Sequence, residues 1–151
     1  MKLKVFVLSA WLAVAGTGAW AADSPAVKTG SAKADILVKS QASWNNKPYT
    51  QYPAGRPELT VLKLTIPPNT ALPWHQHPYP NAGYVLKGEL TIQDKDSGQS
   101  HTFKQGEGFA ESVDDTHRGV SGNSETVLII TYSGVHDVPT FVSKQSNVPE
   151  Y

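Results

Sequence analysis

The sequence has no cysteine among its 151 residues. This absence excludes disulfide bonds, thiol catalysis and thiolate metal ligands together. A fold of this chain must therefore be held by core packing alone. Any bound metal must be held by imidazole nitrogens and oxygen ligands, of which the five histidines and the carboxylates are the available sources.

The sequence also lacks an excess of charge of either sign. It has 13 basic and 13 acidic residues, so nothing in its charge predicts binding to nucleic acid or to an anionic membrane surface. A glycine-rich phosphate loop, a G-x-S-x-G elbow and an H-E-x-x-H metal motif are absent from the sequence as well. Composition and short motifs thus name no substrate.

One long apolar run is present, and it lies at the beginning of the sequence. Lys2 and Lys4 precede the run from Val5 to Trp20, and Ala19-Trp20-Ala21 has the small-x-small pattern of a cleavage site. These features predict a signal peptide at residues 1–21, cut after Ala21. A membrane anchor is the alternative, but Gly16, Thr17 and Gly18 interrupt the run, which falls short of the roughly 20 apolar residues of a span.

Cleavage would leave 130 residues with 11 basic and 13 acidic side chains, which is the size of one domain. We therefore expect a periplasmic or secreted protein with no membrane span after cleavage. Residues 22–43, which are rich in Ala, Ser, Gly and Lys, are predicted to be a flexible leader. Ile36–Val38 is a candidate for one short strand in this leader.

Short strands separated by turn residues dominate the remaining domain, residues 44–151. No window of 12 residues shows a 3.6-residue apolar period, so helices are not expected. Glycine-containing turns at intervals of roughly 8–12 residues are typical of an all-β sandwich or small antiparallel barrel. The predicted strands are 59–66, 74–77, 83–86, 89–93, 101–104, 109–113 and 126–132.

The triplet His75-Gln76-His77 is the strongest chemical signal in the chain. In a strand, residues i and i+2 point to the same face, so the two imidazoles would lie side by side. Such a pair also occurs on ordinary surfaces and predicts little alone. His117 follows 40 residues later, after a predicted strand and turn, at a distance that lets a rolled sheet return beside the pair. Three histidines inside one barrel would hold a metal and leave coordination positions open.

At these positions the sequence resembles the cupins. The first cupin motif reads Gly-x5-His-x-His-x(3–4)-Glu-x6-Gly, and the second reads Gly-x5-Pro-x-Gly-x2-His-x3-Asn. The matching residues are His75, His77 and Gly88 in the first motif, and Gly106 and His117 in the second. The resemblance implies a cupin-like jelly roll, a small antiparallel double-stranded β-helix, with its core motifs within residues 59–133.

Several motif positions differ from the cupin pattern. The opening glycine of the first motif is Asn69, which can also adopt a left-handed turn conformation. The glutamate of that motif is Asn81, so the usual carboxylate ligand is missing. In the second motif, other residues stand in place of the proline, the second glycine and the asparagine: Ser112, Asp114 and Ser121. An amide oxygen such as that of Asn81 can touch a metal without neutralising its charge.

Glu111 is a candidate replacement for the missing carboxylate. Strand alternation places Phe109 and Glu111 on one face, so an inward Phe109 implies an inward Glu111. A carboxylate inside a barrel is costly unless it is paired or bound to a metal. The predicted metal ligands are therefore His75, His77, His117 and Glu111. The alternation of side chains does not by itself show which face of the strand is buried. The alternative that Glu111 faces solvent therefore stays open.

Aromatic residues lie near the histidines in the sequence. Core packing explains most of them, but one or two at a pocket mouth would suit a small aromatic or apolar ligand. The candidate pocket residues are Asn81, Trp74, Tyr79, Tyr84 and Phe109. His101 and His136 match no motif position, and we expect them to be a solvated strand residue and a loop residue.

Two main functions remain open from the sequence. Three histidines indicate a divalent metal, Fe, Mn, Ni or Zn, and the resemblance implies a metal-dependent enzyme, dioxygenase-like or isomerase-like, acting on a small organic molecule. The alternative is a non-catalytic periplasmic cupin that binds a metal or small ligand. An interaction module is a third reading, since strands 59–66 and 126–132 are apolar on both faces, as in a homodimer formed through a sheet. Fold alone does not choose among these functions.

Overall fold

The structure, a computed structural model, describes residues 29–145. The predicted signal peptide at residues 1–21 lies outside the described residues. By its contacts the chain divides into two units, residues 1–33 and 34–151, and the strands belong to the second unit. Between residues 29 and 145 there is no helix that could span a membrane.

Nine strands form the described part of this unit. They are β1 (Pro57–Ile66), β2 (His75–Gln76), β3 (Asn81–Lys87), β4 (Glu89–Asp94), β5 (Ser100–Lys104), β6 (Gly108–Ala110), β7 (His117–Ser121), β8 (Thr126–Val135) and β9 (Val142–Ser143). Each of the seven predicted strands from residue 59 onward overlaps one of them. β7 and β9 were not predicted.

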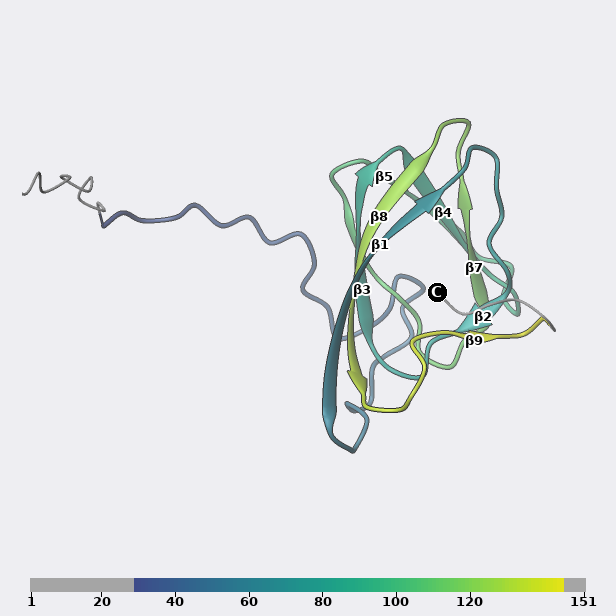
Figure 1. Ribbon diagram of the computed structural model, residues 1–151. Helices are drawn as coiled ribbons and strands as arrows, with labels where there is room; N and C mark the ends of the chain where they lie inside the picture. The colour runs from purple at the N-terminus through teal and green to yellow at the C-terminus, as the bar shows by residue number, and fades with distance from the viewer. Residues whose placement is uncertain (1–28, 146–151) are drawn as a thin grey trace, which may run out of the picture. The chain divides into compact units, whose positions relative to one another are not determined.

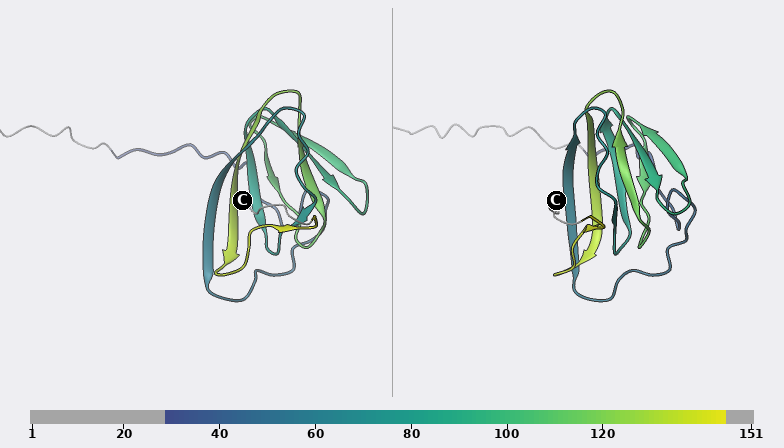
Figure 2. Two further views of the ribbon diagram at one scale, coloured as in Figure 1. Left: turned by 45° about the vertical axis from the view of Figure 1, so that its right-hand side comes forward. Right: turned by 90° about the vertical axis from the view of Figure 1, so that its right-hand side faces the viewer.

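The strands form two antiparallel sheets (Figure 1). One sheet has the order β1-β8-β3-β6, and the other has the order β5-β4-β7-β2-β9. β1 and β8 pair along ten residues, from Pro57 opposite Val135 to Ile66 opposite Thr126. The two sheets lie opposite each other in the views of Figure 2. This arrangement confirms the predicted all-β, jelly-roll fold.

The core lies between the two sheets because alternate side chains of each strand point inward. β4, for example, alternates between half-buried and buried residues along its whole length. At Gly83 the missing side chain leaves room for the Phe109 ring, which would clash with any Cβ there. The buried apolar cluster takes residues from both sheets: Ile66, Tyr79, Val85, Leu90, Ile92, Phe109, Leu128, Ile130 and Tyr132.

Four turn positions of the two cupin-like motifs have left-handed backbone conformations. Gly88 and Gly106 have φ angles of 77° and 93°. Asn69 and Asp114, which stand where the motifs have glycine, have φ angles of 52° and 57°. Asn and Asp tolerate this region better than other non-glycine residues. The turns therefore keep the motif geometry although two glycines are absent.

Some strand predictions were wrong in detail. Ile36–Val38 forms no strand, and the side chains of Ile36 and Leu37 are 75% and 57% exposed. β2 is limited to two residues because Pro73 and Pro78 flank its segment, and proline cannot donate to a sheet ladder. β6 is shorter than predicted and ends at Ala110.

Two strands were predicted to be apolar on both faces. The first half of β8 is buried on both faces, whereas β1 is buried on one face only in the single chain. In β1, Leu59 and Val61 are 82% and 68% exposed. The next inward positions, Leu62 and Leu64, are half-buried and contact the core. The homodimer that would cover the outer face stays a prediction.

Candidate metal centre

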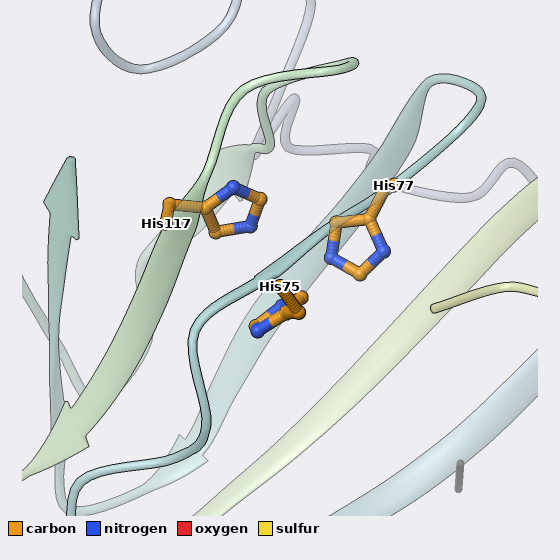
Figure 3. A group of neighbouring side chains, drawn as sticks. All are labelled: His75, His77 and His117. Atoms are coloured by element: carbon orange, nitrogen blue, oxygen red, sulfur yellow. The ribbon is translucent and has the colours of Figure 1, made fainter. Parts of the chain in front are cut away.

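The three predicted histidines meet inside the barrel. His75 lies on β2, His77 lies one residue beyond it, and His117 is the first residue of β7. β2 and β7 are neighbours in one sheet, and His75 lies directly opposite His117. Figure 3 shows the three rings gathered in one place. All three are buried, and one nitrogen from each lies within 4.8 Å of the others.

A backbone carbonyl fixes each of the three rings. The Nδ1 atoms of His75, His77 and His117 lie 2.8, 2.6 and 2.9 Å from the carbonyl oxygens of Pro73, Thr140 and Asp115, respectively. A carbonyl only accepts hydrogen bonds, so each Nδ1 carries the proton and donates it. Each neutral ring then has the lone pair on Nε2, which is the arrangement typical of metal-binding histidines.

Glu111 completes this polar group. Glu111 is only 6% exposed, so the alternative that its side chain faces solvent is wrong. Glu111 Oε2 lies 2.8 Å from His77 Nε2, in an ion-pair contact when His77 is protonated. His117 Nε2, in contrast, is buried and has no hydrogen-bond partner.

The contact between His77 and Glu111 requires a positive charge. With Nδ1 of His77 donating to Thr140, a neutral ring would direct its Nε2 lone pair at a carboxylate oxygen 2.8 Å away. Two lone pairs repel at that distance, so either a second proton on His77 or a cation shared by both groups must be present. Buried polar atoms without hydrogen-bond partners are rare in folded proteins, and a bound ion or water is one of the explanations for them.

The pKa shifts agree with this description of the metal-free site. Burial, followed by its two histidine neighbours, lowers the pKa of His75 to about 3. Burial is also the main reason that the pKa of His117 is lowered. Burial opposes the charged forms of His77 and Glu111 too, but their attraction outweighs it: the pKa of His77 is raised, and that of Glu111 falls to about 2. At neutral pH the site therefore offers the lone pairs of His75 and His117 and an ionised Glu111 carboxylate, while Glu111 favours a proton on His77 that a bound cation would have to displace.

The space beside the histidines is very small. A cavity of about 10 Å³ lies there, and no member of its lining is Asn81, Trp74, Tyr79, Tyr84 or Phe109. Its walls are the polar residues His75, His77 and Glu111, with Leu64, Leu72, Leu90, Gly119, Leu128, Ile130 and Tyr132. A cavity of this size has room for about one water molecule.

The five candidate pocket residues lie elsewhere. Tyr79 and Phe109 belong to the buried apolar cluster. Trp74 is half-buried, with the Arg118 guanidinium 4.4 Å from its ring centroid, and Tyr84 is half-buried on β3. Asn81 is buried, and neither its amide nitrogen nor its amide oxygen has a hydrogen-bond partner. It remains the one candidate of the five with free polar atoms inside the protein.

The two other histidines are outside this centre, as expected. His101 is exposed on β5. His136 follows β8, where its Nδ1 lies 2.8 Å from a carboxylate oxygen of Glu58 at the surface.

Sequence reasoning missed the C-terminal part of the site. Thr140 supplies the carbonyl that holds His77, and the Phe141 ring centroid lies 4.5 Å from that of His75. Phe141 is fully buried. Every residue has a backbone carbonyl, so the sequence does not show that Thr140 supplies one to the site. Phe141 is a single apolar residue after Pro139 and shows no strand or helix periodicity, so its role could not be recognised from the sequence either.

These residues fit a divalent metal ion. The three histidines form a group whose nitrogens could hold a metal ion, and the Glu111 carboxylate lies against one of them. His117 Nε2 is buried without a hydrogen-bond partner. Fold and site together thus define a β-barrel protein with a buried histidine centre able to hold a metal.

Comparison with known proteins identifies the family. Residues 62–132 match the family model described as cupin domain. This segment is therefore a cupin domain, as its motifs predicted. No curated protein in the comparison matches the sequence.

Solved structures with the same fold are distant in sequence. The DMSP lyase DddQ from Ruegeria pomeroyi DSS-3 matches with a TM-score of 0.52 and 14% identity, over 69% of this chain and 49% of that one. The polyketide cyclase RemF from Streptomyces resistomycificus matches with a TM-score of 0.49 and 20% identity, over 61% of this chain and 63% of that one. The chain thus spans less than two thirds of either protein, and at these identities the likeness concerns the fold alone.

Proposed function

We propose that this protein is an exported cupin that binds one divalent metal ion through His75, His77, His117 and Glu111 and uses it to transform a small organic molecule. The observation that carries the proposal is the buried group of three atoms, His77 Nε2, His117 Nε2 and Glu111 Oε2, of which the first and third lie 2.8 Å apart and the second has no hydrogen-bond partner. A shared cation would satisfy all three atoms at once. It would also relieve the contact between His77 and Glu111.

The protein's own residues would hold and tune such an ion. Three carbonyls fix the imidazoles with Nε2 toward the centre, and Glu111 supplies one negative charge from just beyond β6, where the cupin motif supplies it from the position of Asn81. When bound, a divalent metal supplies Lewis-acid chemistry or activates oxygen, the basis of dioxygenase-like and isomerase-like reactions. The apolar walls of Leu64, Leu72 and Leu128 would exclude bulk water from the reacting groups.

A second candidate function is metal binding without catalysis. The cavity of about 10 Å³ favours it, because an organic substrate does not fit beside the histidines in this conformation. The DMSP lyase of similar fold supports an enzymatic function only in one respect: a barrel of this kind can host an active site. The two functions therefore need an experiment that separates them.

Elemental analysis of the natively purified protein tests the metal site. We expect about one equivalent of a first-row metal in the wild type and loss of it in His75→Ala and His117→Ala. His101→Ala is the matched control, because His101 is an exposed histidine outside the site. Absence of metal from the wild type under every loading condition would overturn the proposal.

Turnover by the metal-loaded protein separates enzyme from binder. Oxygen uptake and product formation should be followed with a panel of small phenols and keto acids. Oxygen uptake or product formation that occurs with the wild type and is lost in His117→Ala would support an enzymatic function. A stoichiometric metal with no turnover of any panel member would favour the binding protein.

The location of the protein is part of the same proposal. Its support is the pattern of residues 1–21, which predicts export to the periplasm or the medium. N-terminal sequencing of the mature protein should give Ala22 as the first residue. An intact Met1 on the purified protein from its own cells would contradict export by cleavage.

A further inference from the structure

Glu111 lies beyond the end of a strand, unlike the carboxylate that it replaces. The cupin motif supplies its carboxylate from the position of Asn81, which is the first residue of β3. Glu111 follows β6, a three-residue strand at the edge of its sheet. Its amide still donates to the Asn81 carbonyl at 3.2 Å, and the chain then continues into the loop of residues 111–116. Contacts that hold the start of this loop therefore also hold the backbone that carries the carboxylate.

A compact turn before β1 lies next to this loop. In this turn, residues 43–49, the Ser43 amide donates to the Lys47 carbonyl and the Asn46 amide donates to the Ser43 carbonyl, both at 2.9 Å. Asn46 has a left-handed conformation with a φ angle of 65°, which Asn tolerates better than most residues. We name residues 43–49 the N-terminal clasp. Its shape is thus fixed by hydrogen bonds of its own.

The clasp binds the backbone at the point where β6 ends. The Trp44 amide donates to the Ala110 carbonyl at 2.9 Å, at the edge of the sheet. The Tyr49 hydroxyl donates to the Glu111 carbonyl at 2.5 Å. Because Ala110 and Glu111 are consecutive residues, the two hydrogen bonds together hold the peptide from which the Glu111 side chain projects.

The Asn45 side chain connects the clasp to the rest of the barrel. Its amide nitrogen donates to the carboxylates of Asp94, at 2.9 Å, and Asp115, at 3.3 Å. Its amide oxygen accepts a hydrogen bond from the Ser112 hydroxyl at 3.2 Å. Asp94 and Ser112 are buried, and polar networks in buried surroundings are rigid when their members are paired. The clasp is therefore joined both to β4, through Asp94, and to the loop that carries Glu111.

The Tyr49 hydroxyl keeps its proton and stays a donor over the whole neutral range. Its ring is half-buried. Burial, followed by the charge of Glu111, raises the pKa of Tyr49 to about 12. A hydrogen bond to the Glu111 carbonyl is therefore available at every pH at which the Glu111 carboxylate is ionised and near neutrality.

We infer that Tyr49 is a positioning residue: its hydrogen bond to the Glu111 carbonyl keeps the Glu111 carboxylate beside the histidines, where it can share a metal ion with them. The inference rests on the proposed metal site and adds to it a residue that belongs to neither motif. A carboxylate that moves freely must lose this freedom when it binds a metal, and the entropy cost lowers metal affinity. A carboxylate that the clasp already holds in place avoids this cost.

Zinc affinity in a double-mutant cycle tests this role. Tyr49→Phe removes one hydroxyl and keeps the ring, so zinc affinity in a competition titration should fall by about fivefold to tenfold. In the Glu111→Gln background the same change should have no further effect, because no carboxylate remains to be positioned. A loss of equal size in both backgrounds, or no loss in either, would overturn the inference.

Tyr52→Phe is the matched control for the loss of a tyrosine hydroxyl. Tyr52 lies three residues after Tyr49 and is 74% exposed, so this variant should keep the zinc affinity of the wild type. Cobalt gives a second measurement, because its visible spectrum reports the ligand set. The spectrum of cobalt-loaded Tyr49→Phe should shift toward that of Glu111→Gln, and an unchanged wild-type spectrum would contradict the positioning role.

Hydrogen exchange of the metal-free proteins keeps this inference separate from the proposed function. The Glu111 amide should exchange several-fold faster in Tyr49→Phe than in the wild type, while amides in the middle of β8 keep their rates. Equal exchange of the Glu111 amide in the two proteins would overturn the positioning role, whether or not a metal binds. Faster exchange of this amide, with no binding of zinc to the wild type, would overturn the metal site on which the inference rests.

Discussion

The two ends of the barrel interior follow different rules. At the apolar end, Ile66, Val85 and Phe109 come from three strands and are buried in the apolar cluster. At the polar end, buried histidines and Glu111 face one another, and His117 Nε2 has no hydrogen-bond partner. The apolar end needs no further group. At the polar end the contact between His77 and Glu111 needs a positive charge, either a proton on His77 or the proposed metal ion, and this difference separates the residues that form the core from those that could bind a ligand.

Metal loading should show the largest effect of this difference. A ligand that binds only the folded protein, at about 1,000 times its Kd, stabilises it by about 4 kcal/mol. We expect added metal to raise the Tm by on the order of 10 °C in the wild type and not in His117→Ala, measured by calorimetry. An equal rise in both proteins would mean that the metal binds outside the polar end.

Glu111→Gln removes the charge of the polar end and keeps its shape. The amide of the new side chain can donate to His77 Nε2, so the metal-free variant should fold normally. Because the carboxylate no longer neutralises the ion, metal affinity should fall by about 100-fold, or ~2.8 kcal/mol, in a competition titration. Unchanged affinity would show that Glu111 is not a ligand and that the three histidines suffice.

Val85→Ala is the corresponding change at the apolar end. Val85 is fully buried, and loss of its two methyl groups should lower the free energy of unfolding by about 2 kcal/mol. The loss should be the same with and without metal, and it should add to that of His117→Ala, as changes at distant sites do. A marked departure from additivity in chemical denaturation would show that the two ends are coupled.

Lys47→Ala probes the rim of the polar end and should have the smallest effect. Lys47 pairs with the Asp115 carboxylate, but its side chain is 50% exposed, and such pairs contribute less than about 1 kcal/mol. His117 takes its orientation from the Asp115 carbonyl and not from that carboxylate. Metal content by elemental analysis should therefore stay at the wild-type value, and a loss would show that the Asp115 side chain also positions the ring.

The sequence predicted the parts of the site that depend on side-chain identity and local geometry. The two-residue period of a strand placed His75 beside His77, and the second cupin-like motif placed His117. Alternation from Phe109 made an inward Glu111 one of two orientations left open, and the structure has it buried. Each of these inferences needed only the residue types and the direction in which successive side chains of a strand point.

The parts that could not be predicted depend on tertiary contact. β9 is too short to show a period, and its place beside β2 follows from docking across the chain. Thr140 acts through its carbonyl, which every residue has. Ile36–Val38 has strand-forming residues but finds no partner strand, so local propensity was overridden. Trp74 is near the histidines in sequence, and yet its ring stacks with Arg118 instead of lining the centre.

The long separation between His77 and Thr140 also sets an order in time. A ribosome makes all three histidines and Glu111 by residue 117, but the residue that fixes His77 comes 23 positions later. During synthesis the donor atoms therefore exist before they are arranged. A nascent or truncated product that ends before residue 140 would carry all the proposed ligands but would lack the carbonyl that orients His77.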